Sequence, residues 1–437
     1  MQIPKQEINK RIKHVVALSK EMPFYARKYK ELSIDPDEIK TPQDLLKAYE
    51  KGLYTTPQDL PELVYYKHPN AKGPFYTSGT TGKPKEIWLN PDDEKRVISQ
   101  CIRLYSTILK KNDRILNCFP KEPAISGHYA NIGLQALGYN FHHLPAQEIG
   151  RKPENLVKII REYNPTAFMS LTTFAYRLPL LFERFNIGKN EITFQRILTS
   201  AEPSTTQRRK AIGEDLANAA VFDLYASSEN SVIGYEKEPF TDEHIIDCLT
   251  TLLFLTKNKS DVSTNEVGEV LLTNLYEFSA QPYMVLLNYE IGDWAKCIEK
   301  DEESGVVTII SEIRRETAYL AGAKLNPQEV EVIIDGLSEV KGFLTGEYCI
   351  ITYNDADRKA VAEVRLEARK QLSNEQKEQI SQQVRQKIYS VNFPVMDICE
   401  NVKDAKLAIN ITEPGSLYKG YEHLIKPGKP KRLITLG

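Results

Sequence analysis

Between residues 114 and 224 the sequence alternates short apolar runs with longer amphipathic segments, and this pattern constrains the fold more than any other feature. Short runs rich in apolar residues predict strands, and segments with apolar residues three or four positions apart predict helices. The predicted strands are residues 114–119, 140–144, 167–170, 196–200 and 220–224, and the predicted helices between them are residues 132–137, 154–163, 174–185 and 205–217. Strands separated by helices favour a largely parallel sheet.

The flanking segments have other patterns. Residues 7–46 show helical periodicity, and a long helix is predicted to begin at Pro91. From residue 245 to residue 310, short β-rich runs lie between turns. This texture predicts an antiparallel or barrel-like subdomain.

After Arg314 the texture changes again. Pro327 opens an amphipathic helix, strands are predicted at residues 347–353 and 361–366, and Ser373 begins another helix with a capping box. These elements predict a small α+β domain of ordinary size.

A chain of 437 residues is too long for one compact core, so two or three domains are expected. We place the boundary within residues 312–316. The predicted class is α/β, with a large N-terminal domain (residues 1–313) of α/β subdomains plus a β-rich subdomain. A small, mobile α+β domain (residues 314–437) is expected to act as a lid.

Composition excludes several classes of protein. The net charge is −2, whereas a dedicated nucleic-acid binder usually has a basic excess. No run of about 18 apolar residues occurs, and the N-terminus lacks the apolar core of a signal peptide, so we expect a cytoplasmic protein without a membrane span. The six cysteines are widely spaced without a CxxC pair, which favours reduced thiols over a zinc site.

The strongest local feature is the Gly/Thr-rich run at residues 76–85. Gly79 and Gly82 allow a tight turn that brings backbone N–H groups near an anion. Hydroxyl and ammonium groups add further donors; they belong to Thr77, Ser78, Thr80, Thr81, Lys83 and Lys85. Such a loop suits a polyphosphate, although Pro84 after Gly-Lys distinguishes it from the Walker loop. A solvated loop without a ligand is the alternative.

This loop resembles the Ser-Gly-Thr-Thr-Gly-x-Pro-Lys motif of the adenylate-forming superfamily, which includes acyl-CoA synthetases, adenylation domains and luciferase-like enzymes. Further motifs follow in family order and resemble the phenylacetate–CoA ligase branch. They are Pro23-Phe24-Tyr25, Ser200-Ala201-Glu202-Pro203, the Asp-Leu-Tyr-Ala-Ser-Ser-Glu run at 223–229, the Asn-Tyr-Glu-Ile-Gly-Asp run at 288–293, Arg314-Arg315-Glu316, the Glu-Pro-Gly-Ser run at 413–416, and Gly428-Lys429-Pro430-Lys431-Arg432.

The resemblance implies that the protein uses ATP and Mg²⁺ to activate a small carboxylic acid as an acyl-adenylate. The acyl group then passes to a thiol, with coenzyme A as the expected acceptor. The residues implied in nucleotide binding are Thr77, Ser78, Gly79, Thr80, Thr81, Gly82, Lys85, Ala201, Glu202, Pro203, Asp223, Tyr225, Ala226, Ser228, Asp293 and Arg314. A homodimer is also implied.

Individual roles follow from the same resemblance. Tyr225 is expected to stack on adenine, and Asp293 to accept hydrogen bonds from the ribose. Thr80, Glu229 and Lys429 are the expected catalytic residues. Of these, Glu229 also binds Mg²⁺, a hard cation that prefers oxygen ligands.

Two further residues are implied in the acyl pocket, His128 and Tyr129.

Taken one at a time, the residues implied in nucleotide binding and catalysis also have structural interpretations. Tyr225 is then a core aromatic, Asp293 shapes a turn, and Lys429 is surface charge.

The sequence departs from the family pattern in three ways. Ser200, Ala201 and Ala226 replace glycines, Asn288 and Glu290 replace arginines, and the hinge motif at Arg314-Arg315-Glu316 lacks the paired Asp. These changes leave the acyl acceptor open, with a carrier-protein thiol or an amine as the alternatives. A catalytically silent nucleotide-binding protein is the alternative of another class.

Overall fold

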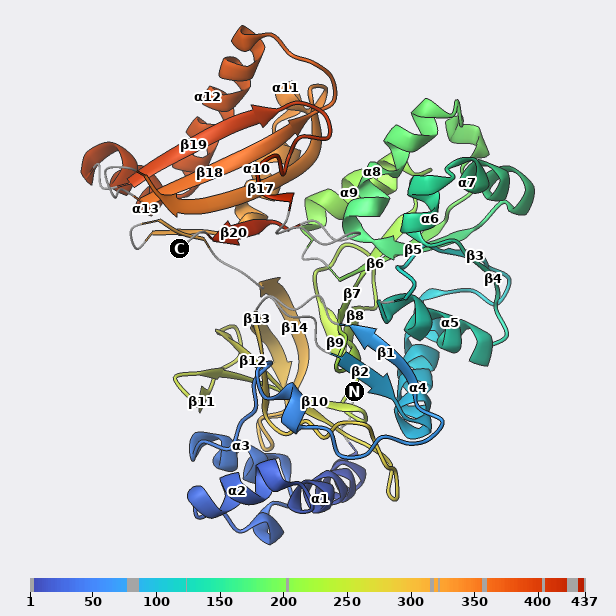
Figure 1. Cartoon of the computed structure of the whole chain (residues 1–437), viewed down its shortest axis with the longest axis vertical. Helices are drawn as coiled ribbons and strands as arrows, with labels where there is room; N and C mark the ends of the chain where they lie inside the picture. The colour runs from blue at the N-terminus through green and yellow to red at the C-terminus, as the bar shows by residue number, and fades with distance from the viewer. Residues whose placement is uncertain are drawn as a thin grey trace. The chain divides into compact units, whose positions relative to one another are not determined.

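The computed structural model describes residues 4–76, 86–122, 124–201, 204–314, 318–320, 323–355, 360–402, 405–422 and 431–435. The chain forms two compact units (Figure 1). The first comprises Met1–Leu171, Ile187–Ala201 and Leu216–Ile313, and the second comprises Thr172–Asn186, Glu202–Asp215 and Arg314–Gly437.

A twelve-stranded sheet runs through the first unit in the order β11-β10-β12-β13-β14-β9-β8-β7-β6-β5-β3-β4. Its parallel half consists of β4 (Asn140–His143), β3 (Arg114–Asn117), β5 (Ala167–Leu171), β6 (Arg196–Ser200) and β7 (Ala220–Ser227). Every residue of β5 and β6 is buried, as expected for strands covered on both faces. The predicted α/β class and its parallel sheet are therefore confirmed.

The remaining strands continue the same sheet. They are β8 (Ser231–Glu236), β9 (His244–Ile246), β14 (Val307–Arg314), β13 (Tyr289–Lys300), β12 (Val267–Asn274), β10 (Thr251–Lys257) and β11 (Ser260–Asp261). The antiparallel pairing expected for this region is present, but the strands form no separate sheet, because β9 pairs with both β8 and β14. The strand β7 pairs in parallel with β6 and antiparallel with β8, so the direction of the sheet changes there.

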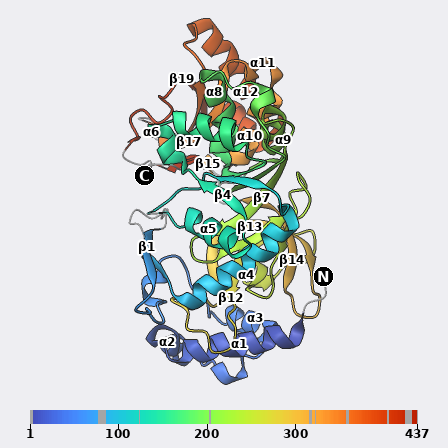
Figure 2. The same cartoon turned by 90° about the vertical axis from the view of Figure 1, so that its right-hand side faces the viewer.

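Helices and a hairpin connect the strands of the first unit. The hairpin β1 (Lys72–Tyr76) and β2 (Glu86–Leu89) precedes α4 (Pro91–Ile108), which lies beside α5 (Ser126–Ala136) (Figure 2). A Cβ at Gly133 of α5 would collide with Cys101 of α4, so only glycine permits this approach. The connection from β4 to β5 carries α6 (Ala146–Arg151) and then the helix predicted at residues 154–163, which is α7 (Glu154–Lys158) continued by a π-helical turn (Ile159–Tyr163).

The N-terminal helices pack against chain that lies far away in sequence. They are α1 (Lys5–Lys20), α2 (Pro23–Glu31) and α3 (Pro42–Glu50). The amide of Asn288, which is fully buried just before β13, donates to the carbonyl oxygens of Leu45 at 2.9 Å and Leu53 at 3.0 Å. The hydroxyl of Tyr25 donates to the carbonyl of Val285 at 2.9 Å. Asn288 therefore serves to anchor the helical segment.

The second unit contains a four-stranded sheet in the order β19-β18-β17-β20. Its strands are β17 (Leu344–Asn354), β18 (Ala360–Ala368), β19 (Ala405–Thr412) and β20 (Leu433–Thr435). The other elements are α8 (Thr172–Arg184), α9 (Thr206–Asp215), β15 (Ala318–Leu320), β16 (Ala323–Leu325), α10 (Pro327–Gly336), α11 (Ser338–Lys341), α12 (Asn374–Val391) and α13 (Phe393–Asp397).

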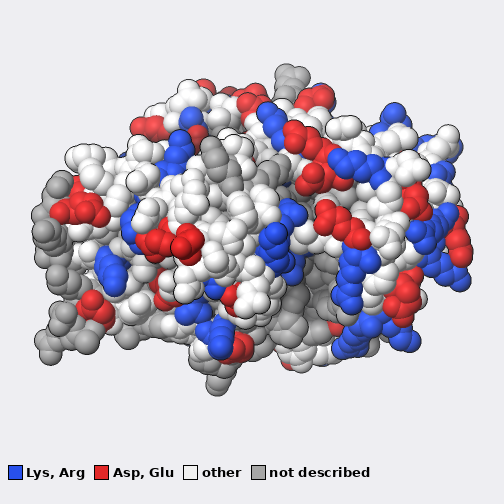
Figure 3. Space-filling model, turned by 90° about the horizontal axis from the view of Figure 1, so that it is seen from above, with Lys and Arg blue, Asp and Glu red and all other residues white. Residues whose placement is uncertain are grey.

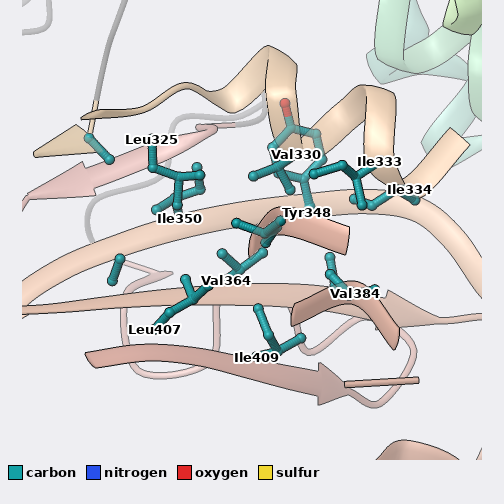
Figure 4. Close-up of a cluster of buried hydrophobic side chains, with 14 of the residues drawn as sticks. Leu325, Val330, Ile333, Ile334, Tyr348, Ile350, Val364, Val384, Leu407 and Ile409 are labelled. Carbon is teal, nitrogen blue, oxygen red and sulfur yellow. The ribbon is translucent and has the colours of Figure 1, made fainter. Parts of the chain in front are cut away.

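Side chains alternate between two cores along β17, as strand geometry requires. Tyr348 and Ile350 join a cluster with residues of α10 and α12 (Figure 4). Cys349 and Ile351 join a smaller cluster with Leu417. Both faces of this sheet therefore contribute to the stability of the unit.

Helices α8 and α9 belong to the second unit through a buried ionic cluster. The guanidinium of Arg208, on α9, donates to Asp335 of α10 at 3.0 and 3.1 Å and to the carbonyl of Gly346 at 3.1 Å. It stacks on Tyr176 of α8 at 4.2 Å and lies 3.4 Å from Glu331. The predicted C-terminal domain thus shares its unit with two crossover helices, and its separate mobility stays a prediction.

In the part of the chain that the structure describes, no helix is long and apolar enough to cross a membrane. On the face shown in Figure 3, basic and acidic side chains are interspersed.

Gly346 offers a test of how tightly β17 and α8 pack. Its φ is +81°, and a Cβ there would collide with the Tyr176 ring. We expect Gly346→Ala to lower the free energy of unfolding by about 3 kcal/mol, since backbone strain and overpacking add. Gly420→Ala is the matched control, because its φ is +89° but open space surrounds it. The control should lose only about 1 kcal/mol in urea titrations; equal losses would contradict the predicted collision.

Candidate functional site

The predicted nucleotide residues that the structure describes gather around the carboxyl ends of β6 and β7. This edge of a parallel sheet is where open α/β sheets commonly bind ligands. Ala201 follows β6 with φ +73°, a left-handed conformation that favours glycine. The glycine that the family has at this position is therefore explained by the backbone conformation, which glycine adopts without strain. The hydroxyl of Ser200 donates to the carbonyl of Leu224 at 2.7 Å and joins the ends of the two strands.

Two residues predicted to bind the nucleotide lie on one face of β7. Asp223 and Tyr225 are two positions apart, so their side chains leave the same face of the strand. The hydroxyl of Tyr225 donates to Oδ2 of Asp293, on β13, at 2.8 Å, and both residues are buried. The predicted adenine-stacking ring and the predicted ribose acceptor are therefore in direct contact.

The turn between β7 and β8, which carries the predicted metal ligand Glu229, is held through its backbone. The carbonyl oxygens of residues 228–230 each accept a hydrogen bond from a side chain. The donors are the Tyr129 hydroxyl at 2.8 Å, the Asn274 amide at 3.3 Å and the Arg96 guanidinium at 3.1 Å. These three hydrogen bonds fix the backbone of the turn. The regular pairing of β7 with β8 is interrupted just before this turn, because the register shifts between Tyr225 and Ala226.

The predicted acyl-pocket residues lie on α5. Tyr129 is buried and contacts the Glu229 turn, as described above. Nε2 of His128 lies 3.1 Å from Glu94, whose carboxylate also pairs with Lys72 at 2.7 Å. The His128 ring packs 5.3 Å from that of Phe75. His128 and Tyr129 therefore lie between the β1–β2 hairpin and the Glu229 turn.

A buried histidine lies behind Asp223. Nε2 of His244, on β9, lies 3.1 Å from Oδ2 of Asp223, and His244 is 1% exposed. Glu236, fully buried on β8, accepts hydrogen bonds from the backbone N–H groups of Asp223 at 2.8 Å and Asp242 at 2.6 Å. Burial opposes a positive charge on the imidazole, but the hydrogen bond and the neighbouring carboxylates outweigh it and raise the pKa of His244.

Several predicted residues lie outside the described part of the chain. They are Thr77, Ser78, Gly79, Thr80, Thr81, Gly82, Lys83, Lys85, Glu202, Pro203 and Lys429, together with the side chain of Arg314. The described ends of the phosphate loop are register partners, Tyr76 with Glu86. Within the described ranges, no three His, Cys, Asp or Glu side chains form a metal-binding group. The roles of all these residues stay predictions.

Several residues of the site have no local signal in the sequence. Arg96 and Glu94 are ordinary polar positions on α4, and Asn274 ends β12. They reach the site only through tertiary packing. His244 is a lone histidine outside the matched motifs, and burial beside a carboxylate is the property that distinguishes it.

The fold and the site together define a class of nucleotide-dependent α/β enzyme, and comparisons with known proteins agree. The family described as AMP-binding enzyme matches residues 32–274. A phenylacetate-coenzyme A ligase of Pseudomonas putida is 26% identical over 222 residues, covering 48% of this chain and 47% of that protein. The enzyme of the same name from Thermus thermophilus is 25% identical over 237 residues, covering 51% and 49%. The matched region thus spans about half the length of these curated relatives.

Solved structures share the fold over more of the chain. A 2-hydroxyisobutyryl-CoA ligase, in the postadenylation state with 2-HIB-AMP, superposes with a TM-score of 0.78 at 17% identity, covering 98% of this chain and 89% of that one. An anthranilate CoA ligase in complex with anthranoyl-AMP gives a TM-score of 0.55 at 16% identity, covering 80% and 64%. The chain belongs to the AMP-binding enzyme family, and the resemblance to the adenylate-forming superfamily is confirmed.

The contact between Tyr225 and Asp293 can be tested by removing one oxygen atom. Tyr225→Phe deletes a hydrogen bond to a buried carboxylate, so we expect the free energy of unfolding to fall by about 2 kcal/mol. Tyr235→Phe, on the neighbouring strand β8, is the control and should change it by less than about 0.5 kcal/mol. Urea titrations measure both, and equal effects would mean that the contact does not stabilise the fold.

Proposed function

We propose that this protein activates a carboxylic acid as an acyl-adenylate at the expense of ATP and then transfers the acyl group to coenzyme A. Membership of the AMP-binding enzyme family supports the nucleotide chemistry. One structural observation carries the proposal. Asp293, which is distant in sequence, is hydrogen-bonded to Tyr225 of β7, the strand that also carries Asp223 and leads into the turn of Glu229.

The proposed reaction has two steps. A carboxylate oxygen attacks the α-phosphorus of ATP, an acyl-AMP anhydride forms, and pyrophosphate leaves. The sulfur of coenzyme A then attacks the acyl carbon, AMP leaves, and the thiol proton is released. Both reactants of the first step are anions, so the enzyme must align them and neutralise their charge.

The residues of the site divide this work between them. Tyr225 supplies an aromatic face for the base, and Asp293 supplies acceptors for the ribose hydroxyls. The phosphate loop, residues 77–85, and Lys429 are proposed to supply the positive and hydrogen-bonding groups for the phosphates. The C-terminal domain that bears Lys429 is proposed to move between the two steps, a hinge type of transition.

Mg²⁺ fits the chemistry of the Glu229 turn. This cation usually binds through one or two carboxylates together with substrate phosphates, so a single described carboxylate is a suitable protein ligand. When bound, the ion supplies charge neutralisation at the phosphates. The three side chains that hold the backbone of this turn keep Glu229 in place for that role.

The acid is proposed to be a compact aryl acid. The two curated relatives are named for phenylacetate, and one structural neighbour was solved with an anthranoyl-adenylate. The side chains of Phe75, His128 and Tyr129 place aromatic rings in the region implied for the acyl group. Aromatic surfaces of this kind suit a planar ring.

The proposal is tested by acid-dependent exchange of pyrophosphate into ATP, followed by thioester formation when coenzyme A is added. A panel of aryl, aliphatic and amino acids should give exchange with one group of acids, without any need for coenzyme A. We expect Glu229→Gln to lower the exchange rate about 100-fold or more, because a carboxylate ligand of the Mg²⁺ that neutralises the phosphates is lost. Glu238→Gln, the same change at an exposed position, should leave the rate within about twofold.

The outcomes separate the alternatives. Exchange without thioester formation would assign the acceptor to a carrier-protein thiol or an amine. ATP binding with no exchange for any acid would support a silent nucleotide-binding protein. Unchanged exchange in Glu229→Gln would remove this residue from the catalytic group.

A further inference from the structure

A row of three buried ionisable residues crosses the sheet where its direction changes. Leu224 of β7 is the register partner of Tyr235 of β8, and Glu236 of β8 is the partner of His244 of β9. Asp223 therefore lies opposite Glu236, with His244 beyond it. Residues opposite one another across a sheet point to the same face, and the His244 imidazole extends past β8 to reach Asp223 at 3.1 Å.

The His244 imidazole is a polar ring at a buried position. His244 is 1% exposed, and its Nδ1 has no hydrogen-bond partner among the described residues. A buried polar atom without a partner destabilises a protein, so packing alone does not explain a histidine there. The hydrogen bond from Nε2 to Oδ2 of Asp223 is the interaction that a histidine adds.

The Asp223 carboxylate keeps acceptor capacity after this hydrogen bond. Its second oxygen, Oδ1, lies 3.4 Å from the Thr199 hydroxyl, a long and weak contact. A carboxylate accepts about four hydrogen bonds. Asp223 also shares its strand face with Tyr225, the residue proposed to stack on the base.

We propose that His244 is a positioning residue for base recognition: it fixes the Asp223 carboxylate so that the second oxygen accepts a hydrogen bond from the 6-amino group of ATP. This inference rests on the proposed function, in that it takes the nucleotide to bind over β7. A carboxylate held in one orientation accepts from a 6-amino group and repels the 6-oxo group of inosine nucleotides. Selection among purines would then depend on a histidine that does not touch the ligand.

The test compares nucleotide binding by calorimetry in the full chain, using ATP, inosine triphosphate and purine riboside triphosphate, which lacks the 6-substituent. The wild type should bind ATP about tenfold or more tightly than the unsubstituted analogue. His244→Phe keeps a planar ring but removes the donor, so this ratio should fall to about twofold or less. His244→Gln can place an amide N–H near the position of Nε2, and the ratio should stay within about threefold of the wild type.

A merely structural role for His244 would weaken all three nucleotides equally, and an unchanged ratio in folded His244→Phe overturns the inference. Asp223→Asn gives a second test that does not need this variant to fold. Because the His244 donor would hold the amide oxygen, the amide N–H₂ would face the base, and the preference should shift at least about tenfold toward inosine triphosphate. A preference for ATP that survives Asp223→Asn also overturns the inference.

These titrations need no turnover, so the two proposals fail separately. Selective ATP binding that depends on His244, without pyrophosphate exchange for any acid, counts against the proposed reaction alone. Exchange with an unchanged nucleotide ratio in His244→Phe counts against the positioning role alone.

Discussion

The hydrogen-bonded pairing of β7 is the constraint on which the rest of the structure depends. This strand pairs in parallel with β6 on one side and antiparallel with β8 on the other, so it joins two kinds of sheet into one. The carboxyl ends of parallel strands lie at a common edge of the sheet, whereas an antiparallel neighbour can follow directly after a short turn. At that edge, the tight turn into β8 places Glu229 directly beyond the strand that carries Asp223 and Tyr225.

The site and the second unit both rely on charges removed from water. Asp223 and Glu236 are buried with His244, while Arg208 is buried with Glu331 and Asp335. Buried ion pairs give little net stability, because desolvation offsets most of the attraction. Removing one partner is nevertheless costly, so such groups fix which surfaces meet and in which register. The ion pair of Arg208 with Asp335 joins α9 to α10, and the contact of His244 with Asp223 joins β9 to β7.

Sequence patterns predicted the elements that depend on local order. The strand predicted at residues 196–200 coincides with β6, and that at residues 167–170 lacks only the last residue of β5. The helix predicted at residues 154–163 is present with the same bounds, although its second half, Ile159–Tyr163, is π-helical rather than α-helical. The continuity of the sheet could not be predicted, because it depends on the pairing of β9 with β14. These strands are more than sixty residues apart in the sequence, and no local pattern indicates that they pair.

The same division holds for the site. The resemblance named Asp223, Tyr225 and Asp293 because they lie in recognisable motifs, and the structure brings two of them into contact. Arg96 and His244 carry no motif, and their meaning comes from burial and from the atoms around them. A pattern of residue types along the chain contains no information on such contacts.

The hydrogen bonds of Asn288 also bear on how the chain folds during its synthesis. Helices α1 to α3 leave the ribosome early, but the amide that holds Leu45 and Leu53 is made more than 230 residues later. At about 5–20 residues per second, that interval is roughly 12 to 50 seconds. Through this time the apolar faces of these helices lack their native partner, and contacts so distant in sequence form slowly. The hydrogen bonds that anchor this helical segment can therefore form only after residue 288 has been made.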